Sequence, residues 1–205
     1  GVYIMTQEEL TMFIYNVVSF ANKAHYDTTG YMRYLVKQDL NNATFNEMIV
    51  KNSDITDKLK IGGSFTFSCW VYRLLSKLEV ADYYILETTK KEDGSSHFVV
   101  LFRVENEYRI CDLANQVAES EKNRERLSSM ALHPKDYSKK ERELVLSSLA
   151  NTNFINQDIL EYSKEYNINR LALAMGIEEI RTYGKLQKIS FIELLKKRQK
   201  DIKSK

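Results

Sequence analysis

Three short strand-like segments after a helical segment constrain the fold of this chain more than any other feature. Segments 82–89, 97–104 and 108–113 are rich in Tyr, Ile, Val and Phe, and only a few residues separate them. The first connection contains Asp93-Gly94, a pair that favours tight hairpin turns. Strands joined this closely run antiparallel, because parallel strands need a long crossover. A helix followed by an antiparallel meander predicts an α+β fold.

The second hairpin decides which side chains share a face of the predicted sheet. If a two-residue turn joins its strands, Val104 pairs with Glu107. Counting back along both strands then pairs Val99 with Asp112. Because side chains alternate along a strand, His97 shares the face of Asp112. A three-residue turn would place Asp112 on the opposite face unless a β-bulge corrects it.

Amphipathic helices are expected before this meander. Apolar residues within 10–21 recur at the i, i+3, i+4, i+7 spacing of a helix that buries one face. Thr6 with Glu9 three positions later matches a capping box at its start. The ranges 28–40 and 44–50 are shorter helix candidates.

The chain after the meander is predicted to be helical throughout. His133-Pro134 contains the only proline and marks the predicted boundary. We therefore expect a core with N-terminal helices over residues 1–134 and a helical C-terminal extension, packed on the core, over 135–205. From Lys185 onward there are eight Lys or Arg against two acidic residues, although the formal net charge of the whole chain is only +2. This basic last helix is either a solvated face or a contact for an acidic partner.

Cys69 is the side chain whose sequence surroundings best suit a nucleophile. A double-glycine break and a polar, aromatic stretch precede it, and an apolar helical run follows over 70–79. The positive end of a helix macrodipole lowers the pKa of a thiol placed there, and the backbone N–H of the same residue can stabilise an oxyanion. His97 begins a strand directly after a turn and is the candidate base. Asp112 on the same face would hold its ring in the required tautomer.

Three segments together resemble the transglutaminase-like superfamily, whose members are relatives of papain-type peptidases. Ser68-Cys69-Trp70-Val71, followed by an apolar helix, resembles the segment that carries their nucleophile. His97-Phe98-Val99-Val100 stands where the family places its histidine strand, and Tyr108 to Gln116 resembles the segment with the third triad residue. The resemblance covers residues 61–116, and it implies a papain-like core in which the active-site helix packs on an antiparallel sheet.

The resemblance implies a thiol-dependent acyl transfer on a peptide or carboxamide bond, with Cys69, His97 and Asp112 as the catalytic triad. Water as the acceptor makes a cysteine peptidase or amidase, which we favour because compact relatives are often hydrolytic. An amine as the acceptor makes a transamidase of the protein-glutamine transglutaminase type. A catalytically inactive interaction module that keeps the fold is the remaining alternative, since a lone cysteine before an apolar helix is usually a small buried residue.

The other chemistry-bearing residues are expected to be structural. Cys111 alternates to the face opposite Asp112 and is predicted to lie in the core. His25 and His133 have no local partner pattern, and Trp70 is predicted to pack the helix. The cysteines and histidines show no metal-ligand spacing, so we expect neither a metal site nor a cofactor.

The expected partner is a peptide or protein substrate. The sequence gives no strong nucleic-acid signal, and no apolar run reaches the roughly 18 residues that a membrane span needs. No signal-peptide pattern opens the sequence, and two cysteines are too few for a disulfide scaffold. We therefore expect a cytoplasmic protein.

Overall fold

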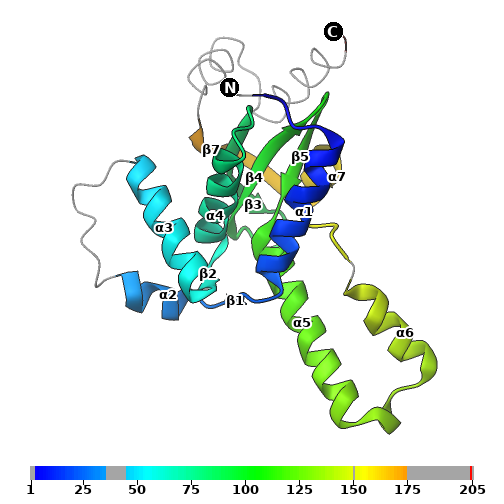
Figure 1. Cartoon of the computed structure of the whole chain (residues 1–205). Coiled ribbons are helices and arrows are strands. Elements are labelled where there is room, and N and C mark those ends of the chain that lie inside the picture. The colour runs from blue at the N-terminus through cyan, green and yellow to red at the C-terminus, as the bar shows by residue number, and fades with distance from the viewer. Residues whose placement is uncertain (1–2, 36–44, 150, 175–203, 205) are drawn as a thin grey trace.

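A five-stranded antiparallel sheet organises the fold (Figure 1), in a computed structural model that describes residues 3–35, 45–149, 151–174 and 204. The strand order is β6-β5-β4-β3-β7, and every neighbouring pair is antiparallel. The strands are β3 (Tyr83–Lys90), β4 (Ser96–Val104), β5 (Glu107–Cys111), β6 (Gln157–Asp158) and β7 (Tyr166–Ala174), and a separate parallel pair consists of β1 (His25–Tyr26) and β2 (Ile61–Gly62). The helices are α1 (Gln7–Ala21), α2 (Thr28–Leu35), α3 (Phe45–Leu59), α4 (Ser64–Lys77), α5 (Leu113–Leu132), α6 (Lys139–Ser148) and α7 (Ile159–Glu165), with a short 3₁₀ helix at Pro134–Asp136. The predicted α+β class is confirmed.

Both hairpins of the meander form as the sequence predicts. In the turn between β3 and β4, Gly94 adopts φ +73°, and its N–H donates to the carbonyl of Lys90 at 2.8 Å. In the turn between β4 and β5, Val104 pairs with Glu107, so the connection has two residues. This register carries Asp112 to the face of His97.

The sheet has two differently covered faces. Helices α1 and α4 and the first turns of α5 cover one of them, which we call the α4 face (Figure 1). Its buried layer includes Phe13, Phe20, Phe67, Cys69, Leu75, Ile85, Val100, Phe102, Cys111 and Val117. We call the opposite face the α7 face, because Tyr162 of α7 hydrogen-bonds Thr88 of β3 there. Alternation places Leu86, Val99 and Leu101 on it, all of them buried.

Of the helices before the meander, α1 agrees with the prediction, whereas α3 and α4 differ from it at their ends. Helix α1 and its capping box are confirmed, since Thr6 Oγ1 accepts from the N–H of Glu9 at 3.2 Å. Helix α3 is one continuous helix, although the sequence predicted only 44–50. Helix α4 begins at Ser64, five residues before Cys69, so the prediction that Cys69 opens the helix is wrong.

The region after residue 134 is not helical throughout, and this part of the prediction is wrong. It contributes β6 and β7 to the two edges of the same sheet, so residues 157–174 belong to the core. Two of the helices expected in this region form, as α6 and as the seven-residue α7. The basic last helix predicted after Lys185 lies outside the described residues.

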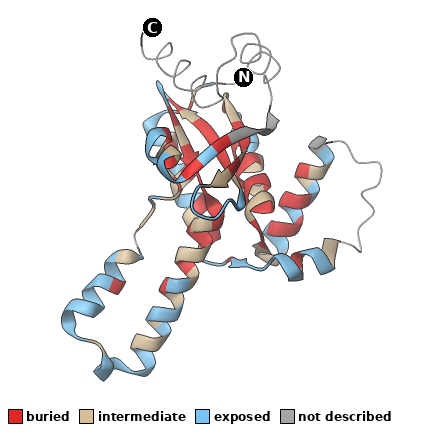
Figure 2. Cartoon of the chain, turned by 180° about the vertical axis from the view of Figure 1, so that it is seen from behind, coloured by how far each residue is buried: buried red, intermediate tan, exposed pale blue. Residues whose placement is uncertain are grey.

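Helices α5 and α6 form a hairpin that projects from the rest of the molecule (Figure 2). The first turns of α5 are buried in the core through Leu113 and Val117, whereas most of α6 is exposed. Arg124, in the middle of α5, donates to the carbonyls of Ala21, Asn22 and Ala24 at 3.1, 2.6 and 2.6 Å. These bonds tie α5 to the backbone carbonyls at the end of α1 and directly after it.

Candidate active site

The structure forms the predicted contact between His97 and Asp112. His97 is the second residue of β4, and Asp112 directly follows β5. The Nε2 atom of His97 lies 2.9 Å from Oδ1 and 2.8 Å from Oδ2 of Asp112. We refer to these two residues as the His97–Asp112 dyad.

The Asp112 carboxylate is buried and fully engaged. Its side chain is 1% exposed, while that of His97 is 15% exposed. Asp112 is also the N-cap of α5, where Oδ1 accepts from the backbone N–H of Asn115 at 3.1 Å. Oδ2 accepts from the side-chain Nδ2 of Asn115 at 2.7 Å. Both oxygens of this buried carboxylate therefore have hydrogen-bond partners.

Two tyrosines surround the dyad on the α7 face. The ring of Tyr166 stacks on that of His97, with centroids 5.4 Å apart, and Tyr162 stacks on Tyr166 at 4.6 Å. The hydroxyl of Tyr162 lies 2.9 Å from Oγ1 of Thr88. Burial raises the pKa of both Tyr162 and Tyr166 above the ordinary value of a phenol. Both phenols are therefore neutral near neutral pH and can donate hydrogen bonds.

The contact through Nε2 determines what the imidazole can do. When His97 is neutral, the proton on Nε2 is donated to Asp112, and the lone pair remains on Nδ1. Within the described part of the chain, no residue hydrogen-bonds Nδ1 of His97. An imidazole oriented in this way by a carboxylate can accept a proton at Nδ1 and return it later.

Cys69 is not part of this arrangement. It is the sixth residue of α4 and is completely buried on the α4 face, in the core that also contains Val100 and Cys111. Burial raises the pKa of its thiol to about 12. Its backbone N–H lies beyond the first four N–H groups of the helix and is therefore used within the helix. The predicted thiolate and the predicted oxyanion donor are both absent at this residue.

The alternation of side chains along β4 explains why Cys69 and His97 are apart. Phe98 points to the α4 face and packs on Phe65 of α4, with ring centroids 5.1 Å apart. His97, its neighbour, points to the α7 face and contacts Tyr166. The sheet therefore lies between Cys69 and the dyad. The structure brings His97 and Asp112 together and does not bring Cys69 to them.

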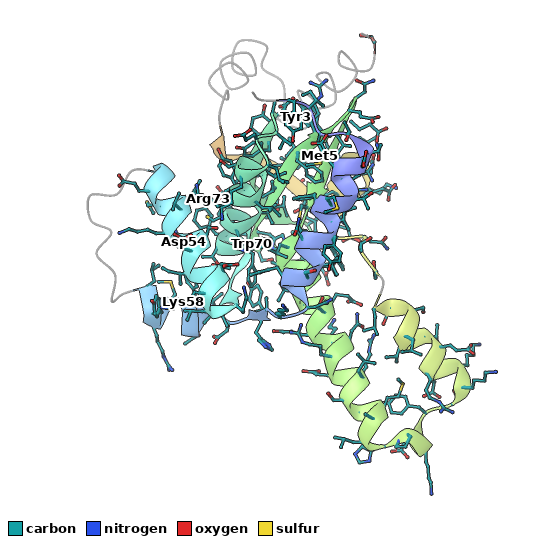
Figure 3. The ribbon with its side chains drawn as sticks, viewed as in Figure 1. Tyr3, Met5, Asp54, Lys58, Trp70 and Arg73 are labelled. Atoms are coloured by element: carbon teal, nitrogen blue, oxygen red, sulfur yellow. The ribbon has the colours of Figure 1, made fainter. Side chains whose placement is uncertain are left out.

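The remaining predicted positions are structural. Cys111 is buried on the α4 face, and burial raises the pKa of its thiol. Trp70 stacks on Phe20 at 4.1 Å and donates from Nε1 to Asp57 at 3.1 Å, on the side of α4 that faces α3 (Figure 3). His25 contacts Glu121 of α5 at 3.1 Å. His133 ends α5 as its C-cap.

Sequence analysis missed two residues near the dyad, Asn115 and Tyr166. Asn115 stands three positions after Asp112, the spacing of an N-cap and its partner, and this signal was present in the sequence. Tyr166 reaches the dyad only because β7 pairs with β3, and no local pattern shows this.

Comparison of the chain with protein-family models, curated proteins and solved structures finds no match. The transglutaminase-like resemblance therefore stays a prediction. Among the described residues, no group of three or more His, Cys, Asp or Glu side chains could hold a metal ion. A search of the same residues finds no helix with the length and apolar character of a membrane span.

Proposed function

We propose that the protein is a hydrolase in which the His97–Asp112 dyad acts as general base and general acid. This proposal rests on one observation, which is that the buried Asp112 carboxylate contacts Nε2 of the partly exposed His97. The contact leaves Nδ1 of the same ring available to a substrate or to water. An imidazole whose other nitrogen is held by a carboxylate can accept a proton and return it.

The proposed reaction is the cleavage of a peptide or carboxamide bond, the substrate class that the transglutaminase-like resemblance implies. Nδ1 of His97 takes a proton from an attacking water molecule as the water oxygen bonds to the carbonyl carbon. The same proton then passes to the departing amine when the C–N bond breaks. Asp112 keeps the ring oriented and stabilises the imidazolium that forms in between.

The Cys69 thiol has no role in this proposal, which departs from the thiol chemistry that the sequence predicted. A thiol with a pKa of about 12 is almost entirely protonated at neutral pH, and the nucleophile in thiol chemistry is the thiolate. The attacking oxygen in the proposed reaction therefore belongs to water.

Incorporation of ¹⁸O from labelled water tests the proposal without a known substrate. A complex mixture of unmodified peptides is incubated with the protein in H₂¹⁸O, and new ¹⁸O-labelled carboxyl groups are identified by mass spectrometry. We expect labelled products from the wild type and from Cys69→Ala, and none from His97→Ala.

Two results would overturn the proposal. Products that disappear in Cys69→Ala would restore the thiol enzyme. No labelled product from the wild type would favour the second candidate, an interaction module without catalysis. One observation favours this second candidate: the α5–α6 hairpin exposes Leu132 by 75%, Leu144 by 61% and Leu146 by 55%, and large exposed apolar side chains are typical of binding surfaces.

A further inference from the structure

Asn115 connects two parts of the dyad's surroundings that are distant in sequence. Its Nδ2 donates to Oδ2 of Asp112 at 2.7 Å and to the hydroxyl of Tyr166 at 3.3 Å. Asp112 is in contact with His97 through Nε2, and Tyr166 stacks on the ring of His97. One amide group therefore holds both of the residues that contact the imidazole.

The geometry of the two contacts restricts the imidazole in different ways. The carboxylate of Asp112 fixes which nitrogen of His97 points inward, and the flat ring of Tyr166 limits rotation of the imidazole out of its plane. Tyr162 also stacks on Tyr166, with the two phenol rings at an angle of 4°. The imidazole thus has a defined orientation only while both contacts are in place.

We infer that Asn115 and Tyr166 are positioning residues for His97. Asn115 holds the carboxylate of Asp112 through its side chain as well as through the helix cap, and it anchors the hydroxyl end of Tyr166. Tyr166 in turn stacks on His97 and keeps Nδ1 directed away from Asp112. The inference rests on the proposed function for its catalytic meaning, whereas the orientation of His97 can be measured by itself.

The proton on Nε2 of His97 gives a direct readout. An imidazole N–H that donates to a buried carboxylate resonates downfield of the amide protons and exchanges slowly with water. Its assignment follows from its loss in His97→Gln. We expect this signal in the wild-type protein, and we expect it to be broadened or lost in Asn115→Ala and in Tyr166→Leu. Tyr166→Phe keeps the ring stack and should retain the signal.

Asn123→Ala is the matched control. Asn123 is also an asparagine of α5, and its amide donates to the carbonyl of Ser148 in the α5–α6 hairpin. Its replacement should leave the downfield signal unchanged. Asn115→Ala keeps the backbone N–H that donates to Asp112, the N-cap of α5. The variant therefore removes only the side-chain donor. Well-dispersed amide signals in each variant confirm that it is folded.

The outcomes separate this inference from the proposed function. An Nε2–H signal that exchanges as slowly in both Asn115→Ala and Tyr166→Leu as in the wild type would overturn the positioning roles, whether or not the protein has activity. If hydrolysis is found, we expect kcat to fall roughly 10-fold to 100-fold in Asn115→Ala, with KM little changed. The signal could be lost in Asn115→Ala and in Tyr166→Leu while the wild type shows no hydrolysis. That result would support the positioning roles and overturn only the proposed function.

Discussion

Cys69 and His97 lie on opposite faces of the central sheet. Cys69 belongs to the core between α4 and the sheet, and His97 contacts Asp112 and Tyr166 on the α7 face. The two residues that sequence analysis paired as nucleophile and base are therefore separated by β4 itself. The pair that does form is His97 with Asp112.

The buried thiol of Cys69 predicts a loss of stability at high pH. Burial raises its pKa from 9.0 to about 12, so the folded protein keeps the proton where the unfolded chain releases it. The stabilisation is complete below about pH 9 and is lost as the pH rises toward about 12. In urea unfolding at about pH 8, 9 and 10, the free energy of unfolding of the wild type should fall more steeply than that of Cys69→Ala, by at most about 1.4 kcal/mol per pH unit. Parallel curves would contradict a buried, protonated thiol.

Asp112→Asn should destabilise the fold. The replacement removes a charged acceptor that serves His97 and both N–H groups of Asn115. An amide nitrogen that takes the place of either oxygen then faces a donor, so we expect the free energy of unfolding to fall by about 1–3 kcal/mol. Asp93→Asn, in the exposed β3–β4 turn, is the control and should change it by less than about 1 kcal/mol. A wild-type urea midpoint for Asp112→Asn would show that the dyad contributes little to stability.

Arg124→Ala should loosen the contact between α5 and the end of α1. Its guanidinium bonds three backbone carbonyls, so the variant leaves acceptors without a donor, and we expect a loss of about 1–3 kcal/mol. Arg124→Lys should rescue only part of this, because an ammonium group cannot reproduce the planar fork. Arg126→Ala, two positions along α5 and exposed, is the matched control. Thermal unfolding of the three variants tests the comparison, and equal Tm values for Arg124→Ala and Arg126→Ala would contradict it.

Gly94→Ala should destabilise the β3–β4 turn for a conformational reason alone. A Cβ at this position meets no atom within 4 Å, but Gly94 has φ +73°, which L-residues with side chains rarely adopt. We expect a loss of about 1 kcal/mol. Gly94→Asn should lose less, since asparagine tolerates left-handed backbone better than alanine does. If alanine proves as stable as glycine in urea unfolding, the turn conformation is wrong.

The sequence was sufficient for those parts of the fold that depend on local spacing. The two-residue connection after Val104 determined the register of β4 and β5, and the alternation of side chains then placed Asp112 beside His97. The capping box of Thr6 and Glu9 is likewise local. In these places the residues that form the structure are also neighbours in the chain.

The face on which α4 packs could not be predicted from the hairpin register. That register shows that His97 and Asp112 share a face, but it does not say which face a helix covers. Helix α4 covers the side of Phe98, Val100 and Phe102, where the apolar side chains are continuous. Its start was also hidden, because Gly63 caps it with no side chain of its own, while Thr66 Oγ1 accepts from the Gly63 N–H at 3.0 Å.

The contribution of β7 was hidden for a different reason. Its pairing with β3 joins segments about 80 residues apart, for example Thr88 with Ile168. No local pattern reports a pairing over that separation, and a helical interpretation of the segment was equally consistent with its apolar residues. Tyr166, which begins this strand, was therefore absent from the predicted site.

The separation of Cys69 from His97 can be tested through the rate of Cys69 alkylation against pH. This rate is measured by intact-mass spectrometry on the wild type and on His97→Ala. Because both thiols are buried, we expect iodoacetamide to add no label to either folded protein near neutral pH. Unfolding should expose both Cys69 and Cys111 to the reagent. Fast labelling of Cys69 with an apparent pKa below about 7.5, lost in His97→Ala, would show a Cys–His pair and would contradict the separation of the two residues described above.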